Sequence, residues 1–225
     1  KKHFIKLFAI SIGSIFLTSG LLISVIYIPV SLVALIFYTY PLMVVIFTFM
    51  LGKKLNLFQI GGFILAFIGL GLALGPSFKS LNIIGILLAF LAAFGASIVL
   101  IVNEYLAKHF HAIFINAFVN IVCLLFFSFI ILFNFEINFS FPQIGWIYLI
   151  IAALCYCIAF YVQLIAVKNI GSSKTSLLLY LEPLVAIVSA VILLKESLSA
   201  TQIIGTSIVI LAIIVTTQNF RVISN

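Results

Sequence analysis

Long apolar runs, separated by short polar breaks, follow one another along the whole chain. Each run is continuous and does not alternate between apolar and polar residues, so the pattern indicates membrane-spanning helices and argues against a membrane β-barrel. About 20 apolar residues suffice for a helix to cross the hydrocarbon core of a bilayer. By this measure the sequence predicts eight spans, at residues 4–26, 30–51, 57–75, 81–102, 112–133, 143–166, 174–194 and 200–219.

The composition agrees with this pattern. Hydrophobic residues make up 66% of the 225 residues and charged residues only 7%, which is too little polar surface to cover a water-soluble globule. The net charge of +7 could indicate a nucleic-acid partner, but the basic residues are scattered at the ends of the apolar runs. We therefore expect an all-α polytopic membrane protein without a nucleic-acid partner, located in a cell membrane such as the bacterial inner membrane.

The distribution of basic residues predicts the orientation of the chain. With the first residues in the cytoplasm, alternating spans place nine of the eleven basic residues on the cytoplasmic side and only Lys79 and Lys195 outside. Cytoplasmic loops of membrane proteins carry such an excess of lysine and arginine. Both ends of this chain are accordingly expected to be cytoplasmic, as are Lys53 and Lys54.

The motif Tyr-x-x-Pro interrupts two of the apolar runs. It occurs at Tyr38 and Pro41 and again at Tyr180 and Pro183, where the second copy also contains Glu182. A proline inside a helix removes a backbone hydrogen bond and costs about 3 kcal/mol, and a carboxylate at mid-membrane costs roughly 3 kcal/mol more. We therefore predict two interrupted helices, whose exposed backbone is tolerated at membrane depth where it lines a cavity or is buried in protein.

These motifs belong to an internal repeat. Residues 31–42 align without a gap with residues 173–184, an offset of 142 positions, and after a slip of one residue 55–62 matches 198–205. The two copies fall in the second and seventh predicted spans, which are an odd number apart, so they cross the membrane in opposite directions. Inverted repeats are typical of secondary transporters, whose substrate site lies near the midplane between the two halves.

The second copy resembles a known family. The segments Lys168-Asn-Ile-Gly, Tyr180-Leu-Glu-Pro and Leu194-Lys-Glu-Ser-Leu-Ser-Ala-Thr-Gln-Ile-Ile-Gly are similar to those of an EamA domain of the drug/metabolite transporter (DMT) superfamily. The resemblance extends over nearly the whole chain and implies ten helices in two halves of five. On that basis residues 1–75 are the last three helices of the first EamA repeat, residues 81–219 are the complete second repeat, and the first two helices are missing.

The resemblance also implies a function. It indicates a secondary transporter that moves a small metabolite or amino acid by alternating access, as an exporter, and that uses no cofactor. One alternative is a membrane-embedded enzyme acting on a lipid-like substrate, although the chain has only four acidic residues and none of them pair. The other alternative is an inactive transporter fragment. Substrate identity, coupling ion and oligomeric state are not encoded in any motif of the sequence.

Candidate substrate-binding residues come from the interrupted helices and from the sixth span. Tyr38 and Tyr180 each precede a proline by three residues, which places them on the same helix face, and two tyrosines would give a cavity a rigid apolar wall with polar tips. The same residues could instead serve only as kinks and interhelical hydrogen bonds. The predicted substrate-binding set is Tyr38, Pro41, Tyr156, Gln163, Tyr180, Glu182 and Pro183, and no metal site is expected.

Glu182 is the most specific of these candidates. Counted from Lys174 at about 1.5 Å per residue, it lies roughly 12 Å into a hydrocarbon core about 30 Å thick, close to the midplane. No basic residue follows Lys174 within its predicted span. We expect Glu182 to bind an amine-bearing substrate or to exchange a proton during transport; alternatively, it only fixes the shape of the helix beside Pro183.

A further polar group, Asn103, Glu104 and Lys108, follows the fourth predicted span. Glu104 and Lys108 are four residues apart, the spacing at which opposite charges pair on a helix. We expect a solvated helix end here, without a functional role.

Overall fold

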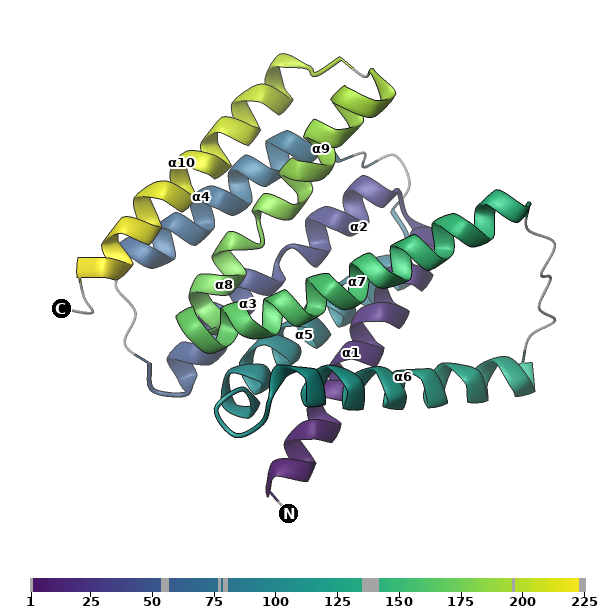
Figure 1. Ribbon diagram of the computed structural model, residues 1–225. Coiled ribbons are helices and arrows are strands. Elements are labelled where there is room, and N and C mark those ends of the chain that lie inside the picture. Colours follow the sequence, from purple (N-terminus) through teal and green to yellow (C-terminus); the bar gives the residue numbers. More distant parts are fainter. Residues whose placement is uncertain are drawn as a thin grey trace.

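The chain folds into a bundle of helices. The computed structural model describes residues 2–53, 57–76, 78, 81–134, 142–195 and 197–222, and over these residues it contains ten helices (Figure 1). Eight segments are long and apolar enough to cross a membrane, because α2 with α3 and α8 with α9 each form one span. The predicted all-α polytopic fold with eight spans is therefore confirmed. The helices are α1 (Lys2–Tyr27), α2 (Val30–Phe37), α3 (Tyr40–Met50), α4 (Leu57–Leu74), α5 (Ile83–Leu106), α6 (Ala112–Asn134), α7 (Gln143–Ile170), α8 (Ser172–Leu178), α9 (Leu181–Leu194) and α10 (Ala200–Val222).

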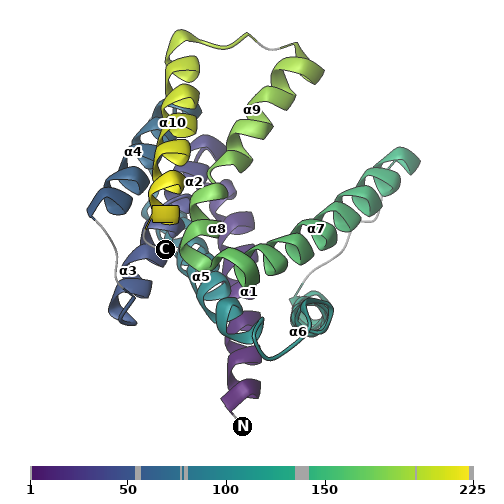
Figure 2. The ribbon, with the colours of Figure 1, turned by 60° about the vertical axis from the view of Figure 1, so that its left-hand side comes forward.

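Both spans that carry the Tyr-x-x-Pro motif are interrupted, as the prolines predict. Pro41 lies in the first turn of α3 and Pro183 in the first turn of α9. Proline suits this place because the first N–H groups of a helix have no partner within the helix. The span α2–α3 and the span α8–α9 run in opposite directions in Figures 1 and 2, which agrees with an inverted repeat.

Two closely packed helix pairs connect the first part of the chain with the second. α1 packs along α5, and α4 packs along α10; the second pair is plain in Figure 1. Glycines allow the close approach, because a Cβ atom on Gly95 or on Gly205 would overlap backbone atoms of the partner helix. Small residues at such contacts let membrane helices gain van der Waals contact, in the absence of a hydrophobic driving force between them.

The largest buried cluster lies where the two interrupted spans meet. Tyr38 and Tyr40 from the first copy and Tyr180 from the second are buried there, and the ring centroids of Tyr38 and Tyr180 are 6.3 Å apart. α7 leaves this core at the point where it meets α8 and diverges from α9 (Figure 2). The bundle is therefore tightly packed around the tyrosines and splayed toward the far ends of α7 and α9.

Candidate functional site

A cavity of about 400 Å³ lies beside the breaks in the two interrupted spans. Helices α1, α5 and α7 contribute to its lining together with residues next to both breaks. A mostly apolar lining with a few polar groups is typical of sites for small molecules. The apolar lining residues are Leu17, Leu21, Phe37, Ala96, Val99, Leu100, Ala159, Phe160 and Leu179, and the polar ones are Ser14, Tyr40, Tyr156, Gln163 and Glu182.

Tyr40 and Glu182 occupy equivalent positions in the two copies of the repeat, and both line the cavity. Tyr40 begins α3, and Glu182 lies in the first turn of α9. A carboxylate is stabilised at this place because the free N–H groups and the helix dipole make the start of a helix positive. The hydroxyl of Ser97 on α5 donates to the backbone carbonyl of Tyr40 at 3.2 Å and holds the start of α3 against α5.

Glu182 is the titratable acid of the cavity. Among the lining residues that the structure describes, it is the one acidic side chain, and lysine, arginine and histidine do not occur among them. The Tyr38 side chain lies close enough to Glu182 for its hydroxyl to interact with the carboxyl group. An ionised group in apolar surroundings needs a partner of opposite charge, and the described lining contains no such residue for Glu182.

The structure separates the predicted site residues into two groups. Tyr156, Gln163 and Glu182 line the cavity. The others are buried in the packed layer around the tyrosines, where Tyr38 lies close to Glu182. Tyr180 is 0% exposed, and its hydroxyl has no hydrogen-bond partner among the described residues. The residues that do not line this cavity are Tyr38, Pro41, Tyr180 and Pro183.

Several lining residues were not among those predicted. Tyr40 could have been found, because the repeat places it opposite Glu182. Phe37 could have been suspected from its place beside Tyr38. Ser14 on α1 and Phe160 on α7 gave no such signal, since single serines and phenylalanines recur throughout apolar helices. Their position in the cavity depends on how α1 and α7 pack against the rest of the bundle.

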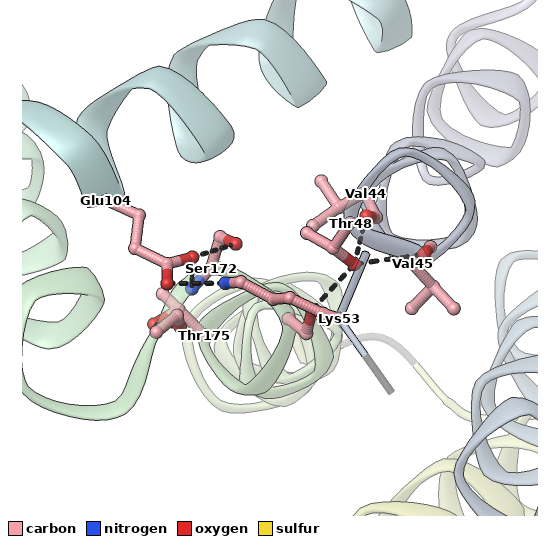
Figure 3. A network of polar contacts seen from close by, with 9 residues as sticks. Val44, Val45, Thr48, Lys53, Glu104, Ser172 and Thr175 are labelled. Atoms are coloured by element: carbon pink, nitrogen blue, oxygen red, sulfur yellow. Dashed lines mark hydrogen bonds and ion pairs between the residues drawn. The ribbon is translucent and has the colours of Figure 1, made fainter. Parts of the chain in front are cut away.

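A second polar cluster, drawn in Figure 3, lies beside a pocket that Lys6 of α1 also lines. Lys53 Nζ donates to Glu104 Oε1 at 2.5 Å, and the backbone N and the hydroxyl of Ser172 donate to Glu104 Oε2 at 3.0 and 2.5 Å. The hydroxyls of Thr48 and Ser173 share a hydrogen bond of 3.1 Å. This cluster joins the end of α3, the last turns of α5 and the start of α8.

The predictions that Glu104 pairs with Lys108 and that this helix end is solvated were wrong. α5 ends at Leu106, so Lys108 lies past the helix and the four-residue spacing no longer brings the two side chains together. The Glu104 side chain is 19% exposed and Asn103 is 1% exposed. Glu104 is instead held by residues 51 and 68 positions away in the chain, which no local pattern reveals.

Comparisons with known proteins agree with this architecture. The model of the EamA-like transporter family matches residues 83–218, more than half of the chain. A crystal structure of a protein superposes with a TM-score of 0.77 at 20% sequence identity, and the alignment covers 93% of this chain and 76% of the other. That likeness concerns the fold alone. No curated protein matches the sequence.

Proposed function

Because this chain belongs to the EamA-like transporter family, a family of membrane transporters in the DMT superfamily, we propose that it is a secondary transporter that exports a small metabolite by alternating access. The cavity around Glu182 is the substrate site. The observation that carries this proposal is that both copies of the inverted repeat contribute equivalent residues, Tyr40 and Glu182, to one cavity. A site between inverted repeats, at interrupted helices, is where secondary transporters bind their substrates.

The division of the chain into repeats is part of the proposal. We assign residues 1–75 to the last three helices of the first EamA repeat and residues 81–219 to the second repeat. The opposite directions of α2–α3 and α8–α9 support this assignment (Figure 1), as does the start of the family match at residue 83. Both ends of the chain are cytoplasmic in this proposal, because the positive-inside rule favours that orientation.

The chemistry of the cavity favours an amine-bearing substrate, such as an amino acid or another small amine. Glu182 supplies a negative charge that is not balanced by a basic residue of the described lining. The rings of Phe37, Tyr40 and Phe160 also line the cavity and offer faces that attract a cationic group. Exchange of a proton at Glu182 is the second possibility for the same residue, and it requires the same carboxyl group.

The test is transport by the purified chain in proteoliposomes, measured against a panel of small amines, amino acids and carboxylic acids. Glu182→Gln keeps the shape and most hydrogen bonds of the side chain but cannot carry a charge. We expect it to lower transport of the preferred amine at least about tenfold, the scale of an interaction with a charged group. Glu136→Gln, a change in the predicted loop between the fifth and sixth spans, is the matched control.

The pH dependence separates the two roles of Glu182. If Glu182 exchanges a proton, Glu182→Gln also removes the dependence of the transport rate on pH. Unchanged rate and pH dependence in Glu182→Gln would contradict both roles and leave the residue with a structural one. Transport of carboxylic acids in preference to amines would contradict the proposed substrate class.

A further inference from the structure

The polar cluster of Lys53, Glu104 and Ser172 lies on one side of the cavity. Glu104 follows the lining residue Leu100 by four positions, and Thr48 follows the lining residue Tyr40 by eight. At about 1.5 Å per residue along a helix, the cluster begins roughly 6 Å beyond the cavity and extends to about 12 Å. It lies at the end of the bundle that carries Lys6, Lys53, Lys108, Lys168 and Lys174, here called the basic end.

Glu104 joins elements that belong to different copies of the repeat. Lys53 follows α3, in the first copy, and Ser172 begins α8, in the second; Figure 3 shows both side chains meeting the carboxylate. α3 and α5 both pack against α8. The hydrogen bond between Thr48 and Ser173 spans the same boundary. Contacts that cross from one half to the other must break if the halves move apart at this end.

Local sequence positions both partners of Glu104. Gly52 has a φ of 85° and ends α3 in a Schellman motif, in which Lys53 N donates to Thr48 O and Gly52 N to Phe49 O; the left-handed residue suits glycine and directs Lys53 off the helix end. Gly171, with φ 82° and ψ 165°, turns the chain from α7 into α8. Because Gly171 has no side chain to cap α8, Glu104 accepts the hydrogen bonds of the first residue instead.

The contacts are weak enough to open. Lys53 is 46% exposed, and an ion pair between groups that water can reach contributes little to stability. A pocket of about 260 Å³ beyond the cluster is lined by Lys6, Lys53, Glu104 and Lys108 among others, so water can hydrate the two charges when they separate. At the opposite end of the bundle, here called the open end, α7 and α9 diverge (Figure 2).

We propose that Glu104 is the latch residue of a gate at the basic end, closed in this structure while the cavity opens toward the other end. This inference rests on the proposed transport function. In the alternate state the bonds that join the halves, Glu104 to Lys53 and Thr48 to Ser173, break, the start of α8 moves away from the end of α3, and the cavity opens at the basic end. Glu104 thus sets the balance between the two states without touching the substrate.

Cysteine accessibility tests the gate without any substrate. In a chain with Cys123, Cys155 and Cys157 replaced by alanine, Ala159→Cys places one thiol on the lining of the cavity. A membrane-impermeant maleimide is applied from either side of oriented vesicles, and the labelling rate is compared for the background chain, Glu104→Gln, Lys53→Gln and Lys108→Gln. Lys108 lines the same pocket beyond the latch, so Lys108→Gln removes an equal charge there and is the matched control.

We expect Glu104→Gln to raise labelling from the basic end about tenfold and Lys53→Gln to raise it by about threefold, since Glu104 loses its ion pair and weakens two hydrogen bonds. Labelling from the open end falls in parallel, and Lys108→Gln matches the background. Unchanged labelling in both latch variants would overturn the proposal, and so would an equal effect of Lys108→Gln. If Glu104→Gln fails to fold, Lys53→Gln alone decides.

The outcomes separate this inference from the proposed function. A shift in labelling in a chain that transports nothing from the panel supports the gate and counts against the transport proposal. Transport without any shift in the labelling rate of the latch variants supports the transport proposal and counts against the gate.

Discussion

Glu182 and Glu104 lie in different surroundings, and each proposed role follows from them. Glu182 faces the cavity from the first turn of α9, close to Tyr38, so its carboxyl group is available to a ligand. Glu104 accepts bonds from Lys53 and from two donors of Ser172, so its charge is already satisfied within the protein. The first arrangement suits binding, and the second suits closure.

Tyr38 and Tyr180, which occupy equivalent positions in the two copies, also differ in their surroundings. Tyr38 lies close to Glu182, whereas the Tyr180 hydroxyl is buried without a partner among the described residues. We predict that Tyr38→Phe changes the apparent affinity for the proposed amine substrate at least about threefold, because the hydroxyl near the Glu182 carboxyl group is lost. Tyr180→Phe, the matched control, leaves affinity unchanged and raises the midpoint of thermal unfolding.

Initial rates over a range of substrate concentrations, together with melting curves in detergent, measure both effects. An equal loss of affinity in the two variants would show that the aromatic layer acts only as packing.

At the scale of the helices, the local sequence was most informative where a proline interrupts an apolar run. Pro41 and Pro183 predicted the breaks because proline cannot continue the hydrogen bonds of a helix, and the breaks fall beside these residues. The glycines of the α1–α5 and α4–α10 pairs gave no indication of which helix they would meet. Helix pairing depends on contacts between distant parts of the chain, and most membrane helices offer small residues on more than one face.

Close packing of α4 against α10 leads to a second prediction. A Cβ on Gly205 would overlap backbone atoms of Gly69 and Ala73, whereas a Cβ on Gly61 of α4 would meet nothing within 4 Å. Gly205→Ala should therefore destabilise the chain by about 2 kcal/mol, the usual scale of overpacking. Gly61→Ala should be neutral or slightly stabilising, because alanine favours helix over glycine.

Reversible unfolding in mixed detergent measures the free energy of unfolding of both glycine variants. Equal values for the two would contradict the close approach of α4 and α10.

At the scale of the whole molecule, the number and type of spans were predictable because each span is a local property of composition. The opposite directions of the two copies followed from the odd number of spans that separates them. The lining of the cavity was predicted only in part, with Tyr156, Gln163 and Glu182 found and Ser14 and Phe160 missed. A cavity is a product of how α1, α5 and α7 pack around the breaks, and the pairing of Lys53 with Glu104 depends on the same packing.

The inverted arrangement predicts that equivalent ends of the two copies face opposite sides of the membrane. Lys53 follows α3 and Lys195 follows α9, at the ends of spans that run in opposite directions (Figure 1). In a chain without its native cysteines, Lys53→Cys should react with an impermeant maleimide only from the cytoplasmic side and Lys195→Cys only from the outside. Reaction of both from one side would rule out the inverted topology.

The central claim is that the cavity between the two copies holds the substrate, and substrate protection tests it most directly. The measurement is the rate at which a maleimide modifies Ala159→Cys, with and without the transported amine, beside Lys195→Cys as a control outside the cavity. At ten times its dissociation constant, a substrate bound in the cavity should slow modification of Ala159→Cys about tenfold by mass action and leave Lys195→Cys unchanged. Equal modification of Ala159→Cys with and without saturating substrate would contradict the claim.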